Sequence, residues 1–139
     1  MASPTFWSVY LDPLIAELRE SGVGCHVAGV YAGVVAYADD LMVLAPNRMA
    51  AQKMLYICDN YAKQYNMKFS TNLDPKKSKS KALYVVGRRG SGTPLPLPLI
   101  LSGKELPWVD KCDHLGHTLT TDGKMDQDCR EKRAAFCGS

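Results

Sequence analysis

Two adjacent aspartates, Asp39 and Asp40, stand between apolar runs at residues 34–37 and 41–45 in the stretch YAGVVAYADDLMVLAP. Aspartate is favoured in turns, so the pair could simply form the tip of a hairpin. Because the flanking runs are apolar, such a tip would emerge from a buried sheet, where neighbouring carboxylates repel each other unless a cation compensates. A hard divalent cation with oxygen ligands is the natural compensation.

Phosphoryl transfer is the chemistry that such a pair would serve, because two divalent ions about 4 Å apart clamp the attacking and leaving oxygens. Successive strand residues point to opposite faces, so both acids share one site only if the turn bends them together. We therefore expect Asp39 to be the better metal ligand and Asp40 the secondary one.

A basic segment lies further along the chain. Between Asp74 and Glu105 there is no acid, and the bases in the first half of this stretch are Lys76, Lys77, Lys79, Lys81, Arg88 and Arg89. A local positive patch attracts phosphates even though the net charge of the whole chain is only +3. The alternative is an ordinary solvated loop.

Four further side chains, Cys112, His114, His117 and Cys129, are of types that bind zinc. Their order and spacing match no familiar zinc motif. We expect His114 and His117 in one strand, three residues apart and hence on opposite faces, which disfavours a shared ion. Zinc is therefore the weaker hypothesis for this region.

The elements that would position these groups follow from hydrophobic periodicity and turn signals. Helices are predicted at residues 3–22, with an interruption at Pro13, at residues 47–65, capped by Asn47, and at residues 125–136. Strands are predicted at residues 25–31, 34–45 with a break at Asp39-Asp40, 67–70, 82–86, 106–109 and 114–120, the last two as a hairpin. This order predicts an α+β fold, with an antiparallel sheet and helices packed on one face.

Composition and cysteine content indicate the cellular compartment of the protein. The 139 residues are of single-domain size, and the five cysteines are odd in number and scattered, with no secretory signal before them. We expect an intracellular protein of cytoplasm and nucleus that is not secreted. Residues 21–38 lack Asp, Glu, Lys and Arg, but they contain four glycines and His26. Two buried strands explain this segment better than a membrane span, so no membrane partner is expected.

The motifs together resemble the reverse transcriptases of non-LTR (LINE-type) retrotransposons, in the order of that family. Tyr37-Ala38-Asp39-Asp40 is similar to the YxDD motif of the polymerase palm. Residues 3–22, SPTFWSVYLDPLIAELRESG, resemble the end of the preceding palm block and its helix, and residues 58–80, CDNYAKQYNMKFSTNLDPKKSKS, resemble the next block. Residues 109–123, VDKCDHLGHTLTTDG, resemble the primer-grip hairpin, and residues 125–136 resemble the start of the thumb.

The resemblance implies a role for each matching residue. Asp39 and Asp40 would hold Mg²⁺, two ions in the complete enzyme, with Mn²⁺ possible. Tyr37 and Ala38 would lie near the primer terminus, and Lys77 would assist the release of pyrophosphate. The residues implied to contact nucleic acid are Leu115 and Gly116 of the primer grip and Lys76, Lys79 and Lys81 of the basic segment.

The implied activity is RNA-directed DNA polymerisation, with an RNA template, a DNA primer and deoxynucleoside triphosphates as partners. Residues 1–102 would be a partial palm, and residues 103–139 the primer-grip hairpin and the start of the thumb.

Two departures from the family pattern limit this expectation. The family needs another aspartate from an earlier palm block, and Asp12 lies at the wrong place for it. The spacing of residues 72–77 also differs from the expected one, which affects the assignment of Lys77. We therefore expect a fragment that lacks the upstream fingers and palm segment of its polyprotein and is inactive alone. The alternatives are a non-catalytic nucleic-acid-binding remnant, a remnant without function, and a fragment of a group II intron-type reverse transcriptase.

Overall fold

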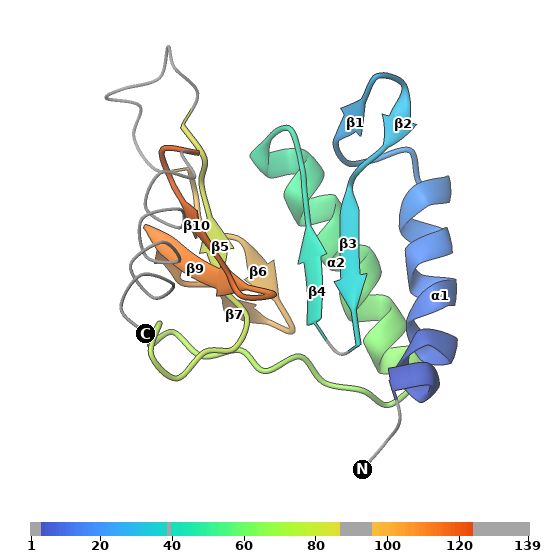
Figure 1. The fold of residues 1–139 in the computed structure, drawn as a ribbon. Helices are drawn as coiled ribbons and strands as arrows, with labels where there is room; N and C mark the ends of the chain where they lie inside the picture. Colours follow the sequence, from blue (N-terminus) through green and yellow to red (C-terminus); the bar gives the residue numbers. More distant parts are fainter. Residues whose placement is uncertain (1–3, 39, 87–95, 124–139) are drawn as a thin grey trace, which may run out of the picture.

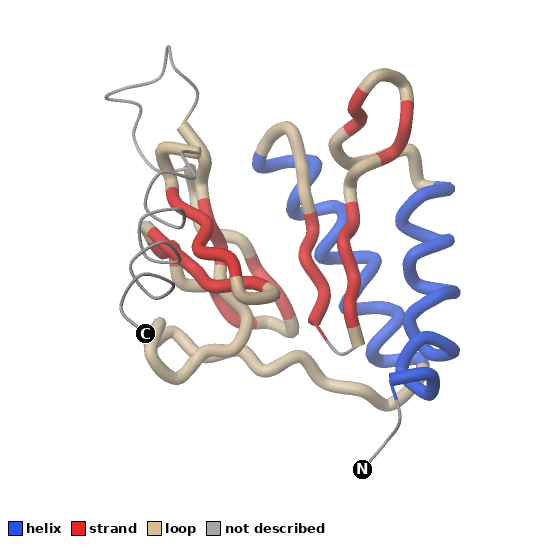
Figure 2. The backbone as a smooth tube through the Cα atoms, in the orientation of Figure 1, coloured by secondary structure: helices blue, strands red, loops and turns tan. Residues whose placement is uncertain are grey.

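The computed structural model describes residues 4–38, 40–86 and 96–123 (Figure 1). Both described helices precede residue 65, and the described residues after them form strands and loops (Figure 2). The elements are α1 (Pro4–Glu20), β1 (His26–Val27), β2 (Val30–Tyr31), β3 (Val34–Tyr37), β4 (Asp40–Val43), α2 (Arg48–Gln64), β5 (Ala82–Leu83), β6 (Ile100–Leu101), β7 (Lys104–Glu105), β8 (Trp108–Val109), β9 (Lys111–His114) and β10 (His117–Thr120). The predicted α+β class is confirmed.

Helix α1 continues through Pro13, so the predicted interruption there is wrong. Proline lacks the N–H that would bond to the carbonyl four residues earlier. The hydroxyl of Tyr61, on α2, donates to the carbonyl of Tyr10 in this part of the helix. The packing of α2 thus supplies an additional donor next to the one that Pro13 lacks.

Helix α2 begins as the sequence predicts. The side chain of Asn47 accepts a hydrogen bond from the backbone N–H of Ala50 at 2.9 Å, and its own backbone is extended. Such a cap satisfies one of the N–H groups that the first turn of a helix leaves free.

A first core lies between the two helices and the hairpin that β3 and β4 form. Its buried residues are Leu11, Leu14, Leu18, Met54, Cys58 and Tyr61, one apolar stripe from each helix. From the hairpin, Val34, Leu41 and Val43 pack against this core. The helices therefore cover one face of the β3–β4 hairpin, as predicted.

A second core lies among the downstream strands and is formed by Ala82, Leu99, Leu101 and Leu106. Ala51 and Leu55 of α2 pack against it, so α2 borders both cores. The described strands form separate two-stranded ladders, all antiparallel except the parallel pair β5–β8. They do not join into the single antiparallel sheet that the sequence predicts.

The C-terminal strands differ from the prediction. The predicted hairpin of residues 106–109 with residues 114–120 is wrong, because β8 pairs with β5, and β9 pairs with β10. Residues 67–70 form no strand. The predicted helix at residues 125–136 and the connection with Arg88 and Arg89 lie outside the described residues. Within the described ranges, neither helix is long and apolar enough to cross a membrane.

Candidate active site and nucleic-acid-binding surface

The acid pair lies where the β3–β4 hairpin, the acid hairpin, turns. Tyr37 is paired with Asp40 across the hairpin, so residues 38 and 39 alone connect the two strands. Ala38 has a φ of 51°, in the left-handed region that residues other than glycine, asparagine and aspartate seldom adopt. Asp40 is exposed, whereas Asp39, the favoured metal ligand, lies outside the described residues.

The register of the hairpin decides which face carries the acid. Residues directly opposite each other in an antiparallel pair share a face, so Asp40 lies on the same face as Tyr37. The other face, with Val34, Leu41 and Val43, packs against the helices. The Tyr37 side chain is 67% exposed. An accessible carboxylate and an accessible phenol ring are therefore held together on the open face of a hairpin whose other face packs on the helices.

A carboxylate in this place fits a divalent cation, because hard cations prefer oxygen ligands and Asp39 precedes Asp40 in the sequence. Among the described residues, no three His, Cys, Asp or Glu side chains lie close enough to hold one ion. The hairpin can thus contribute at most two carboxylates, and a tight site needs ligands from another segment or from a substrate.

The basic segment, residues 71–81, forms a loop with its own hydrogen bonds, the lysine loop. The N–H of Ser80 donates to the carbonyl of Ser70 at 3.0 Å and closes the loop. Ser78 is buried, and its hydroxyl accepts from the N–H of Asn72 at 3.1 Å and donates to the carbonyl of Ser80. The carboxylate of Asp74 accepts from the N–H of Lys76 at 2.9 Å. The backbone of this loop is therefore fixed by polar contacts, not by apolar packing.

The lysines predicted to contact nucleic acid or pyrophosphate all lie on this loop or directly after it, with exposed side chains: Lys76, Lys77, Lys79 and Lys81. The carboxylate of Asp74, within the loop, accepts a hydrogen bond from the backbone N–H of Lys76. The loop therefore presents a positively charged surface with an ordered backbone. For these lysines the sequence and the structure agree on exposure.

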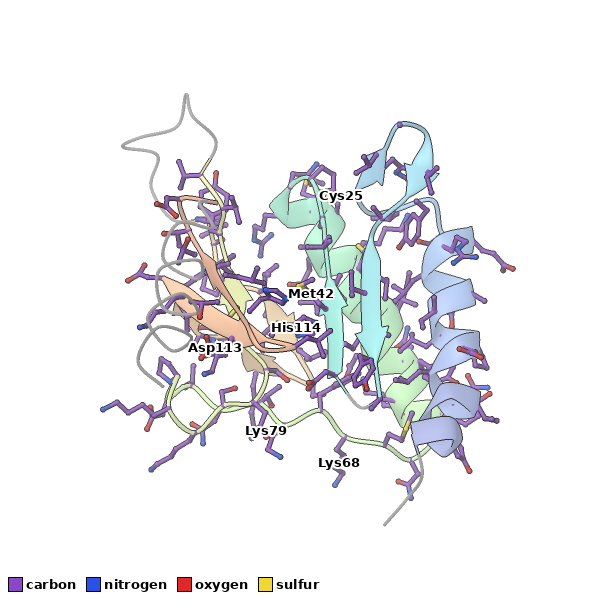
Figure 3. All side chains as sticks on the ribbon, viewed as in Figure 1. Cys25, Met42, Lys68, Lys79, Asp113 and His114 are labelled. Carbon is purple, nitrogen blue, oxygen red and sulfur yellow. The ribbon has the colours of Figure 1, made fainter. Side chains whose placement is uncertain are left out.

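Sequence reasoning did not single out Lys68, which belongs to the same surface. Met67 and Phe69 pack against the first core, and Lys68 between them is exposed. The bond between Ser80 and Ser70 joins its segment to the lysine loop. Figure 3 shows the side chains of Lys68 and Lys79 projecting from the same edge of the molecule. The alternation of apolar and polar residues in MKFS was the signal that could have identified Lys68.

The other predicted contacts, Leu115 and Gly116, form the turn between β9 and β10. Their φ angles are 50° and 73°, the two positive values that a tight two-residue hairpin requires. His114 and His117 are directly opposite each other across this turn, so the predicted placement on opposite faces is wrong. The error came from assigning both histidines to one strand.

Two cysteines of the described residues, Cys58 and Cys112, are poor ligands or nucleophiles. Burial raises the pKa of the Cys58 thiol to about 12, and burial also raises the pKa of Cys112. A protonated, buried thiol is unreactive and binds metals weakly. Trp108 packs against the second core and meets the ring of Tyr84 edge to face, which makes it a packing residue.

Comparison with known proteins adds one finding. A family model described as "Reverse transcriptase (RNA-dependent DNA polymerase)" matches residues 1–119. The matched range includes the acid hairpin, the lysine loop and most of the β9–β10 hairpin. No curated protein and no solved structure matches the chain.

Proposed function

Because the chain belongs to the reverse transcriptase (RNA-dependent DNA polymerase) family, we propose that it forms part of the palm of a non-LTR retrotransposon enzyme. Residues 1–102 are the palm portion, and residues 103–139 are the primer-grip hairpin and the start of the thumb. The parent reaction is RNA-templated DNA synthesis, in which a primer 3′-hydroxyl attacks the α-phosphate of a deoxynucleoside triphosphate and pyrophosphate leaves.

The observation that carries this proposal is the register of the acid hairpin. It places Asp40 and Tyr37 on one open face while the opposite face is anchored on two helices. Asp39 and Asp40 would hold Mg²⁺, for which Mn²⁺ could substitute, and the ions would supply positive charge beside the reacting phosphate. Tyr37 and Ala38 lie next to the primer terminus.

The metal site is incomplete without a further carboxylate. The only acids before the hairpin in the sequence are Asp12, Glu17 and Glu20, all exposed on α1, whose buried stripe faces the hairpin. We propose that the missing ligand comes from a segment that is not among these 139 residues, and we expect the 139 residues alone to be inactive.

The outer edge of β4 is a suitable place for that segment. The N–H of Leu44 bonds to the carbonyl of Gly33, which fixes the bonded pairs of the ladder at every second residue. The backbone groups of Leu41 and Val43 therefore point away from β3. Within the described residues, β3 is the only strand that pairs with β4. An added strand would satisfy these groups and bring a carboxylate to the same end of the hairpin.

Primer extension on an RNA template, with Mg²⁺ or Mn²⁺, tests the proposed inactivity. We expect no incorporation by the 139 residues alone. Incorporation that Asp39→Asn abolishes would contradict the inactivity and would at the same time identify the site. Incorporation that Asp39→Asn leaves intact would argue against the hairpin as the metal site.

The lysine loop binds the primer or template backbone through Lys76, Lys79 and Lys81, and Lys77 assists the release of pyrophosphate. Binding to phosphates makes affinity fall with salt, and removing one such cation lowers the slope of log K against log salt by about one. The combined Lys76/Lys77/Lys79/Lys81→Ala variant should bind an RNA–DNA duplex more weakly and with a shallower slope. Lys53→Ala, an exposed lysine on α2, is the matched control. An unchanged slope in the loop variant would exclude the loop as the binding surface.

A non-catalytic nucleic-acid-binding protein is the second candidate. The observation that favours it is the hydrogen-bonded order of the loop, which does not depend on the acid hairpin. This candidate predicts that Asp39→Asn and Asp40→Asn leave duplex affinity unchanged with or without Mg²⁺. Its site of action, like that of the polymerase, is proposed to be inside the cell, where the described cysteines stay reduced.

A further inference from the structure

Helix α2 binds the backbone of the segment that leads into β6. Nε and Nη2 of Arg48 donate to the carbonyls of Leu97 and Pro98 at 3.0 and 2.9 Å. The side-chain amide of Gln52 donates to the carbonyl of Ile100 at 2.8 Å and accepts from its N–H at 2.9 Å. Gln52 therefore pairs with Ile100 as a neighbouring strand would.

The contacts continue along the same side of the helix. The hydroxyl of Ser102 donates to the carboxylate of Asp59 at 2.9 Å, and Lys63 forms an ion pair with Asp59 at 2.7 Å. Residues 48, 52 and 59 lie on one helix face, because their separations of four and seven residues are close to whole turns. The contacts made by Arg48 and Gln52 are all to backbone atoms, so this row holds the path of residues 97–100 whatever their side chains are.

Backbone hydrogen bonds connect the segment held by Arg48 and Gln52 to the strands that carry the β9–β10 turn. The N–H of Leu106 bonds to the carbonyl of Leu99 at 2.7 Å, next to the residue held by Gln52. The N–H of Ala82 bonds to the carbonyl of Pro107, and β5 then pairs with β8. The N–H of Thr121 bonds to the carbonyl of Asp110 at 3.0 Å and closes the base of the β9–β10 hairpin. A continuous set of backbone bonds thus connects Ile100 with that hairpin.

The connection between α2 and the acid hairpin runs through the buried residues of α2. Met54, Cys58 and Tyr61 are buried in the first core, against which the acid hairpin packs. One helix is therefore fixed to the acid hairpin by apolar packing, and to the downstream strands by the apolar contacts of Ala51 and Leu55 as well as by polar side chains on another row. Only the polar side chains bind the backbone of residues 97–100, so we expect the orientation of the Leu115 turn relative to the Asp40 turn to depend on them.

We propose that Arg48 and Gln52 are positioning residues that hold the downstream strands, with the Leu115–Gly116 turn, in a fixed orientation relative to the acid hairpin. They act through the backbone of residues 97–100. This inference rests on the proposed function, in which one primer–template duplex contacts both turns. A duplex that must engage two surfaces binds tightly only when the protein holds them at a compatible distance and angle.

Residual dipolar couplings of the backbone amides test the orientation directly. In the unaltered chain and in Lys53→Ala, one alignment tensor should fit both the β3–β4 and the β9–β10 hairpin. In the Arg48→Ala/Gln52→Ala variant, each hairpin should still fit a tensor of its own, but no common tensor should fit both. A common tensor in that double variant would overturn the proposal.

A milder variant guards against loss of the fold. Gln52→Glu keeps the acceptor for the N–H of Ile100 but loses the donor to its carbonyl. We expect it to fold, as circular dichroism and dispersed amide signals would show, and to loosen the common orientation partially. If it folds and both hairpins still share one tensor as tightly as in the unaltered chain, the inference about Gln52 is wrong.

Duplex affinity separates this inference from the proposed function. The Arg48→Ala/Gln52→Ala variant should bind an RNA–DNA duplex about ten-fold more weakly or worse, with the salt slope retained because no phosphate-binding lysine is removed. Unchanged affinity in a variant whose hairpins have lost their common tensor would contradict a functional role for the positioning. An unaltered chain that does not bind the duplex would refute the proposed function, while the dipolar couplings would still decide the orientation.

Discussion

Four hairpins of the described residues turn through two residues, and the acid hairpin differs from the other three. The turns of β1–β2, β6–β7 and β9–β10 are Ala28-Gly29, Ser102-Gly103 and Leu115-Gly116, each with positive φ at both residues. The β3–β4 turn is Ala38-Asp39, with aspartate in the place where the others have glycine. Glycine adopts positive φ without steric cost, whereas other residues do not.

Asp39 stands in the sequence position of the fourth turn where the other three have glycine, and its carboxylate is the reason for its presence in our account. The two kinds of turn also differ in their support. The acid hairpin has three residues packed on a core of two helices, whereas the β9–β10 turn has the exposed Leu115 and a glycine. Apolar packing therefore supports the strands of the acid hairpin, whereas the β9–β10 turn depends on the positive φ angles of its two residues.

The largest effect is expected from removing the packing under the acid hairpin. Leu14 is fully buried in the first core, and Leu14→Ala should lower the free energy of unfolding by about 2–5 kcal/mol. Leu115→Ala, at a side chain 43% exposed, should change it by less than about 0.5 kcal/mol. Urea unfolding followed by circular dichroism measures both. Similar losses in the two variants would mean that packing does not distinguish the two hairpins.

A smaller loss is expected at the turn glycine. Gly116→Ala places a side chain at a φ of 73°, in open space, so the cost is conformational and should be about 1–2 kcal/mol. Gly103→Ala, at the same φ and also in open space, is the matched comparison and should cost a similar amount. If the free energy of unfolding stays unchanged in both variants, these turns tolerate side chains. The aspartate at position 39 would then need no functional explanation.

The reverse substitution should show the opposite sign. Asp39→Gly gives the acid hairpin the turn residue that the other three have, so we expect a gain in stability of up to about 1 kcal/mol. The same variant should lose affinity for divalent ions, because a carboxylate is removed. Thermal unfolding and ion titration check the two effects together. A destabilised variant would mean that Asp39 contributes to the fold itself.

The smallest effect is expected at the β6–β7 turn, where the hydroxyl of Ser102 donates to the carboxylate of Asp59 on α2. A hydrogen bond from Lys63, and further bonds from Ser102, hold the pKa of Asp59 below its usual value. A carboxylate with a lowered folded pKa adds stability above its unfolded pKa of about 3.9, and this contribution is lost as pH falls through the folded pKa. The stability advantage over Asp59→Asn should therefore shrink as the solution is acidified below about pH 4. A constant difference across that range would exclude the ionised form as its source.

Local signals predicted much of the fold. The Asn47 cap, the apolar stripes of the two helices and the turn at the acid pair each depend on neighbouring residues, and the structure agrees with them. The continuity of α1 through Pro13 was not predicted, because the donor from Tyr61 comes from a residue far along the chain. The parallel pairing of β5 with β8 is equally non-local and has no marker in either strand.

The site shows the same division. The exposure of the loop lysines followed from their composition, but the buried Ser78 that orders the loop did not, since a serine among lysines has no apolar signal. The β9–β10 turn was missed because alternation of residue types runs on through Leu115 and Gly116. The row of Arg48 and Gln52 resembles any solvated helix face until Ile100 is placed beside it.

The central claim is that the acid turn, and not the other turns, binds a divalent ion. Paramagnetic broadening of backbone amide signals by a small amount of Mn²⁺ tests it most directly on the chain as it is. We predict that broadening centres on residues 38–41, that Asp39→Asn and Asp40→Asn each reduce it, and that the amides of Leu115 and Gly116 stay sharp. Broadening centred on Asp113 or Asp122, or broadening at residues 38–41 that survives both substitutions, would contradict the account.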